Sequence, residues 1–136
     1  MVTSIRSGQL VIHRFWGELV LRDLVAATVF VNEQLSNTTS SDNTLLGVLL
    51  DLRDCLATGS NKTYEVFSAT LINASKNQVV KPIANEITVK RAYLVGSSED
   101  AMRTNEIMNQ VKPSWLWSVF DQEASAEAWL LDVSLK

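Results

Sequence analysis

The chain has 136 residues, of which 46% are hydrophobic and 20% are charged, and its formal net charge is −3 at pH 7. This length suits a single domain over residues 1–136 with a real hydrophobic core, and this composition argues against global disorder. The negative charge leaves no basic footprint of the kind that binds phosphate backbones, so we expect no nucleic-acid partner.

Two further features of the composition limit the cellular setting. Cys55 is the only cysteine, which excludes an internal disulfide and a multi-cysteine metal site. No apolar run approaches the roughly 18 residues that span a bilayer. The N-terminal segment contains Arg6 and Arg14 where a signal peptide needs an apolar stretch. We therefore expect a cytoplasmic protein without membrane insertion, and without a metal or cofactor.

The most informative stretch is the nearly unbroken apolar run at 45–52, LLGVLLDL, which ends at Arg53 and Asp54. A strand with one wet face would alternate apolar and polar residues, and this run does not. Continuous apolar runs of this length are typical of strands that are covered on both faces. We therefore predict an interior strand here, with helices on both sides of the sheet.

The residues before this run predict a hairpin and a helix. Two strand-like runs, 2–6 and 9–16, are separated by Ser7 and Gly8, which suit a hairpin turn. From 19 to 35 the apolar residues follow helical spacing and form a buried stripe. Phe30 falls on the polar side of this helix, where it is either a single exposed aromatic or a contact with a partner subunit.

The remaining residues alternate helix and strand patterns, giving the order β-β-α-β-α-β-α-β-α. After the interior strand we expect a polar turn at 54–62, a helix at about 61–76, a strand at 87–96, a helix from Ser97 or Ser98 to about Val111, a strand at 115–120 and a helix capped by Asp121. Strands joined through helices form right-handed parallel crossovers. We therefore predict an α/β fold with an open, mixed, mostly parallel sheet and flanking helices.

Several short segments, spread over nearly the full chain, together resemble a known family. They are GEL at 17–19, VLLDLR at 48–53, RAYLVG at 91–96, VFD at 119–121 and EAWL at 127–130. In their order along the chain they resemble the SpoIIAA-like proteins, which share the fold of the STAS domain of sulfate transporters and anti-sigma-factor antagonists. The resemblance implies a SpoIIAA-like (STAS-like) fold and a regulatory role through protein binding.

The same resemblance suggests one modification site. The anti-sigma antagonists carry a phosphorylatable serine in an Asp-Ser-Ser/Thr-Gly turn after the central strand. Counting forward from Asp51 places Ser60 at that position, although the aspartate before it and the glycine after it are missing. A phosphate on Ser60 would add about two negative charges near a helix start. The alternative is a serine that caps the helix.

No pattern in the sequence predicts catalysis. Pairing His13 with Cys55 as base and nucleophile would leave no third group to orient them, and a hydrogen-bonded structural histidine is the simpler interpretation. Carboxylates near the carboxyl edge of the predicted sheet lack the dense spacing of a calcium loop. They are Asp51, Asp54, Glu99 and Asp121. We expect them to cap helices and turns, and we expect no enzyme.

Two tryptophans are the strongest non-catalytic feature. Trp115 and Trp117 share one face of the last predicted strand, where packing beneath the final helix explains them most simply. A dimer contact or an apolar ligand site is the alternative. We therefore predict a non-enzymatic regulatory module that binds a protein partner or a second copy of itself. The alternative function is a carrier or sensor of a small apolar ligand held between helix and sheet.

Overall fold

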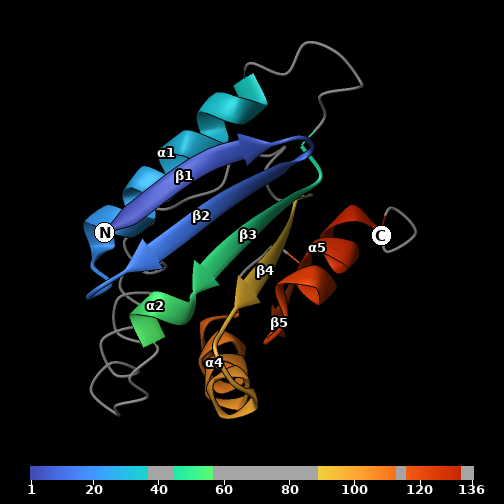
Figure 1. Ribbon diagram of the computed structural model, residues 1–136. Helices are drawn as coiled ribbons and strands as arrows, with labels where there is room; N and C mark the ends of the chain where they lie inside the picture. Colours follow the sequence, from blue (N-terminus) through green and yellow to red (C-terminus); the bar gives the residue numbers. More distant parts are fainter. Residues whose placement is uncertain (37–44, 57–88, 113–115, 133–136) are drawn as a thin grey trace.

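A computed structural model describes residues 1–36, 45–56, 89–112 and 116–132 (Figure 1). The elements within these ranges are, in chain order, β1 (Val2–Ser7), β2 (Leu10–Trp16), α1 (Leu21–Ser36), β3 (Gly47–Leu52), α2 (Arg53–Leu56), β4 (Lys90–Leu94), α4 (Ser98–Val111), β5 (Trp117–Phe120) and α5 (Glu123–Leu131). The helix expected at 61–76 lies outside the described residues.

The strands form a five-stranded sheet in the order β1-β2-β3-β4-β5. β1 and β2 are antiparallel, and the turn between them contains Gly8 with a φ of 58°, a conformation that glycine adopts readily. Each later strand is parallel to the one before it. The predicted mixed, mostly parallel sheet with flanking helices is confirmed.

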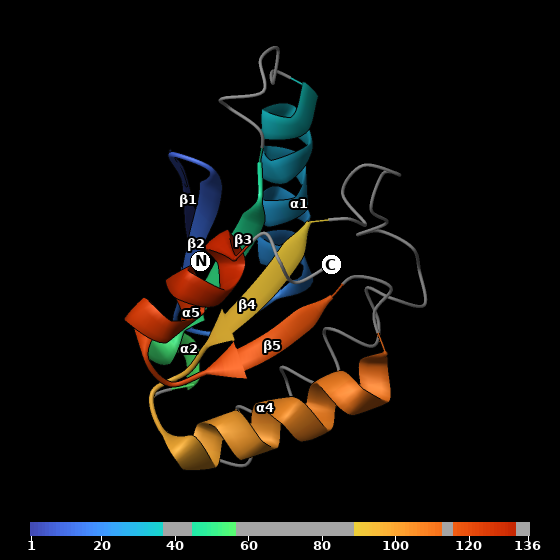
Figure 2. The same ribbon diagram turned by 90° about the vertical axis from the view of Figure 1, so that its right-hand side faces the viewer.

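β3 is the interior strand that the apolar run predicts. All of its residues are buried, and alternate side chains enter different hydrophobic clusters. Val48 and Leu50 pack in the cluster that includes α1 and α4, whereas Leu49 packs with Leu130 of α5. Figures 1 and 2 place α5 on the opposite side of the sheet from α1 and α4. We call these two sides the α1/α4 face and the α5 face.

α5 approaches the sheet closely because β3 begins with a glycine. A Cβ atom on Gly47 would lie 2.6 Å from Cδ2 and 3.0 Å from Cβ of Leu130, which is fully buried. Real Cβ atoms do not come this close to other heavy atoms. The absence of a side chain at Gly47 therefore sets the distance between β3 and α5.

Several element boundaries differ from the predicted ones. The interior strand starts at Gly47 rather than at 45, and α2 follows it directly where we expected a polar turn. The reason for the second difference is local: the Arg53 N–H donates to Asp51 Oδ1 at 3.1 Å and turns the chain at once. The N-cap of α5 is Gln122, without a side-chain hydrogen bond, and not Asp121.

The cap of α4 agrees with the sequence. Its N-cap is Ser97, one of the two serines predicted for this position, and the Ser97 Oγ accepts a hydrogen bond from the Asp100 N–H at 3.1 Å. Glu99 and Asp100 occupy the first turn, where the helix dipole favours negative charge.

None of the helices that the structure describes combines the length and apolar character needed to cross a membrane.

A buried lysine fixes the other end of α5. Lys90 Nζ donates to the carbonyl oxygens of Trp129 and Asp132 at 2.6 and 2.7 Å, and it lies 5.1 Å from the centre of the Trp129 ring. These carbonyls belong to the helix end that lacks partners within the helix, and a cation there also complements the helix dipole. Lys90 therefore ties the C-terminus of α5 to β4.

We expect Lys90→Met to lower the free energy of unfolding by about 1–2 kcal/mol, because the two carbonyls lose a charged donor while burial of an ammonium is relieved. Urea denaturation measures this loss. Arg22→Met is the matched control, since it removes one positive charge from an exposed position on α1. Equal stability of the two variants would contradict a capping role for Lys90.

Candidate functional site

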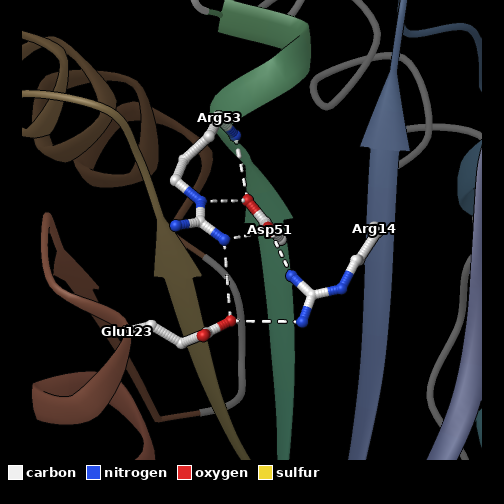
Figure 3. Close-up of polar contacts among 4 residues, drawn as sticks. All are labelled: Arg14, Asp51, Arg53 and Glu123. Atoms are coloured by element: carbon white, nitrogen blue, oxygen red, sulfur yellow. Dashed lines mark hydrogen bonds and ion pairs between the residues drawn. The ribbon is translucent and has the colours of Figure 1, made fainter.

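Four charged side chains from four segments meet near the carboxyl ends of β2 and β3 (Figure 3). Arg53 Nε and Nη2 donate to Asp51 Oδ1 and Oδ2 at 2.9 and 2.8 Å. Arg14 Nη1 also donates to Asp51 Oδ2, and its Nη2 donates to Glu123 Oε1 at 3.2 Å. Arg53 Nη2 lies 3.6 Å from the same Glu123 oxygen. We call this group the Arg14–Arg53 cluster.

Asp51 is the centre of the cluster, and its side chain is only 8% exposed. Burial alone would raise the pKa of this carboxyl, but the hydrogen bonds and charge of Arg53, with the hydrogen bond of Arg14, outweigh burial and lower the pKa. The hydrogen bond to Asp51 in turn raises the pKa of the Arg53 guanidinium. Asp51 is therefore ionised at neutral pH and holds both guanidinium groups in place.

The sheet register explains how the cluster assembles. Arg14 and Asp51 are direct partners in the parallel pairing of β2 with β3, so both side chains project to the α5 face. Arg53 follows two residues later at the start of α2. Glu123 arrives from the first turn of α5, which begins at this end of the sheet. The side chains of Arg14 and Arg53 remain 46% and 41% exposed, so solvent reaches both.

His13 is a buried structural residue on the α1/α4 face. It is 1% exposed, Ser4 Oγ lies 2.7 Å from its Nδ1, and its ring makes edge contacts with Phe15 and Phe30. Burial, with a smaller contribution from the charge of Arg91, lowers the pKa of His13 to about 3. The imidazole is therefore neutral at physiological pH, in line with the expected structural histidine.

Cys55 is held in a form that disfavours nucleophilic chemistry. Its thiol donates to the carbonyl oxygen of Gly17 at 3.1 Å, and burial is the main cause that raises its pKa to about 11. A reactive cysteine needs a lowered pKa and a neighbouring base. The polar contacts described for Cys55 and for His13 go to Gly17 and to Ser4, and not to each other.

The acidic residues that the sequence placed near the carboxyl edge do not gather into one group. Asp51 belongs to the Arg14–Arg53 cluster, whereas Glu99 accepts from Arg103 on α4 at 3.1 Å. Asp54 and Asp121 are exposed. Within the described part of the chain, no three side chains of His, Cys, Asp or Glu are placed to hold a metal ion.

The aromatic residues suggested as contacts have different surroundings. Phe30 is half-buried and packs against the core and His13, so the expectation that it projects into solvent is wrong. Trp117 is also half-buried, but against the cluster of the α1/α4 face, so the expectation that it packs beneath the final helix is wrong. Trp115 and Ser60 lie outside the described residues. Partner contacts by these residues and phosphorylation of Ser60 stay predictions.

A different surface presents exposed apolar side chains. On β1, Ile5 is directly opposite Ile12, so it projects to the α5 face, and it is 50% exposed. Trp16 projects to the same face at the end of β2 and is 40% exposed. We call Thr3, Ile5, Ser7 and Trp16 the β1–β2 surface. Arg14 lies within it, because Thr3 is its direct partner across the hairpin.

Sequence reasoning found Asp51 but missed its partners. Parallel pairing of 9–16 with 45–52 could have placed Arg14 beside Asp51, because both runs were predicted as strands of a mostly parallel sheet. The approach of Glu123 depends on where α5 crosses the sheet, and no pattern in the sequence reports that. The hairpin prediction did not say which strand forms the edge of the sheet, so it did not indicate that Ile5 is exposed on the edge strand β1.

Comparisons with known proteins address the fold. No known family model matches the sequence, and no curated protein matches it. Among solved structures, the chain is similar to an uncharacterised protein from the DUF3478 family with a SpoIIAA-like fold, from Shewanella loihica. The identity is 12%, the similarity covers 96% of this chain and 92% of that one, and the TM-score is 0.50. Together with the sheet topology, this similarity shows that the chain has a SpoIIAA-like α/β fold.

Proposed function

We propose that the chain is a non-enzymatic regulatory module that binds another protein through the β1–β2 surface. The observation that carries the proposal is the exposure of Ile5 and Trp16 on a part of the α5 face. These large apolar groups flank Arg14, and aromatic residues and arginine are enriched in protein interfaces. The sheet provides a rigid support for such a contact.

The state of the two most reactive side chains supports a binding role over catalysis. His13 has a pKa of about 3 and is 1% exposed, so it is a poor base at neutral pH. Cys55 has a pKa of about 11, so its thiolate is scarce. Among the described residues, the exposed side chains near this surface are instead charged and apolar groups suited to contact, such as Arg14, Ile5 and Trp16.

The test compares two variants of the intact protein. Ile5→Ser combined with Trp16→Ser removes the apolar contacts of the β1–β2 surface. Met102→Ser is the control, because Met102 is 63% exposed on α4 and lies away from this surface. Each protein is immobilised, and proteins that bind from the host extract are quantified by mass spectrometry. We expect one or more proteins to bind the original chain and the control but not the double variant.

Other outcomes separate the alternatives. Identical binding to all three proteins would contradict a contact through Ile5 and Trp16. Sedimentation that shows self-association of the original chain, abolished in the double variant, would make a second copy the partner. An apolar molecule that co-purifies in native mass spectrometry would instead favour the carrier function.

A further inference from the structure

We propose that Arg14 and Arg53 form a recognition site for one oxyanion group of the partner, and that Glu123 occupies this site in the free protein. The inference rests on the proposed function only for the identity of the partner. The oxyanion is a side-chain carboxylate or a phosphoryl group, which present the same kind of oxygen to a guanidinium. The geometry around Glu123 carries the argument.

One carboxylate oxygen marks the recognition position. Glu123 Oε1 lies 3.2 Å from Arg14 Nη2 and 3.6 Å from Arg53 Nη2, so two guanidinium groups converge on a single oxygen (Figure 3). Convergent arginine forks are the arrangement that proteins use to bind carboxylates and phosphoryl groups. The chain's own glutamate thus shows where an external oxyanion would lie.

The two arginines are fixed independently of Glu123. The Asp51 carboxylate accepts hydrogen bonds from Nε and Nη2 of Arg53 and from Nη1 of Arg14, and its side chain is 8% exposed. These contacts leave Nη2 of Arg14 directed at the recognition position. A site whose supporting groups are held by other bonds does not need to reorganise when its ligand changes.

Glu123 itself is held weakly. Its side chain is 37% exposed, and ion pairs of this kind contribute about 0–1 kcal/mol. Glu123 is in the first turn of α5, where the helix dipole stabilises its charge whether or not it contacts the arginines. Its side chain can therefore rotate into solvent at low cost and expose the position.

Charge balance favours replacement by another anion. The two arginines carry two positive charges, and Asp51 supplies one negative charge, so loss of Glu123 leaves one positive charge unmatched within the cluster. Asp54 is also near Arg53, but it is exposed and is the smallest of the causes that raise the Arg53 pKa. An incoming oxyanion restores the balance without burial of a new charge.

The position is accessible from the proposed contact surface. Arg14 lies between Ile5 and Trp16 on the α5 face, and its side chain is 46% exposed. A partner that covers Ile5 and Trp16 would bring its own acidic or phosphorylated side chain beside Arg14. The apolar groups would supply contact area, and the arginines would select partners by charge.

The test uses small anions and needs no partner protein. Inorganic phosphate and acetate are titrated into the full chain, and amide shifts are followed by NMR. We expect Glu123→Gln to bind phosphate up to about fivefold more tightly than the original chain, because a competing carboxylate contact of at most about 1 kcal/mol is removed. Glu127→Gln is the matched control, since it makes the same change one turn further along α5 and should leave binding unchanged.

A second variant tests the role of the arginines. Adding Arg14→Gln to Glu123→Gln should abolish the gain and should abolish shifts at Asp51 and Arg53. Equal gains in Glu123→Gln and Glu127→Gln would show an effect of net charge alone and would overturn the inference. A gain that survives Arg14→Gln would also overturn it. A preference for phosphate over acetate identifies a phosphoryl group as the ligand, and equal affinity identifies a carboxylate.

The two proposals fail separately. Ile5→Ser with Trp16→Ser should leave phosphate binding intact while it removes the partner. If phosphate binds but no partner depends on Ile5 and Trp16, the proposed function is refuted and the anion site is retained. If a partner binds through Ile5 and Trp16 and its binding is unchanged by Arg14→Gln, the proposed function is retained and the recognition role of the arginines is refuted.

Discussion

The free energy of unfolding should fall by about 2 kcal/mol between pH 6.5 and pH 4.5 because of His13 alone. The folded pKa of His13 is about 3, below its ordinary value of 6.5, so the unfolded chain binds a proton more readily than the folded one. Stability contributed by the neutral imidazole is fully present above pH 6.5 and is lost as pH falls toward 3. The slope approaches about 1.4 kcal/mol per pH unit.

The variant His13→Gln isolates this effect because it cannot be protonated. Urea denaturation of both proteins at several pH values should show that the variant lacks the slope between pH 6.5 and 4.5. Asp51 has a lowered pKa and acts in the same direction, but only at more acidic pH, so this window separates the two groups. His13→Gln retains Asp51, so the loss of stability that this variant still shows below pH 4.5 includes the contribution of Asp51.

A direct measurement covers the case in which the variant folds poorly. The chain has one histidine, so its ring signals in an NMR spectrum are unambiguous. They should keep the chemical shifts of a neutral ring down to about pH 4, since the ring is packed between Phe15 and Phe30. Protonation with a midpoint near 6.5 would contradict the buried position of His13.

Leu130→Ala should lower the free energy of unfolding by about 2–5 kcal/mol, the range measured for fully buried leucines. Leu130 is 0% exposed and packs with Leu49 on the α5 face. Chemical denaturation measures the loss. A cost below about 1 kcal/mol would mean that α5 is not packed on β3 as described.

Gly47→Ala tests the same contact from the opposite side, with an expected cost of about 1–3 kcal/mol from overpacking. Gly96→Ala is the control, because its new Cβ would meet only Asp100 Oδ2 at an ordinary 3.8 Å. In the double variant with Leu130→Ala, the clash with Cδ2 disappears. The loss of unfolding free energy in the double variant should therefore be smaller than the sum of the two single losses, by at least about 0.5 kcal/mol.

Much of the fold follows from patterns that the sequence contains. The run at 45–52 predicted an interior strand because both faces of β3 are covered, and the serines before α4 predicted its cap because Ser97 accepts the Asp100 N–H. Boundaries were less accurate where one side chain decides them. Asp51 starts α2 by binding Arg53, and the sequence alone does not show which of several polar residues makes such a bond.

The candidate site was harder to predict because it depends on tertiary placement. The periodicity of β2 shows that Arg14 and Trp16 share a face, but it does not show that α5 stops short of this part of the sheet. Phe30 illustrates the opposite error: helical spacing placed it in solvent, whereas His13 gives it an aromatic neighbour in the core. Exposure of a single residue depends on the elements that cover it, and periodicity describes only its own element.

The Arg14–Glu123 contact joins residues 109 positions apart. Arg14 and Arg53 come from β2 and the start of α2, whereas the competing Glu123 reaches them only after α5 has packed on the sheet. An anion at the recognition position binds the folded protein and not the unfolded chain, so it would shift the folding equilibrium toward the native state. The melting temperature would therefore rise with ligand concentration.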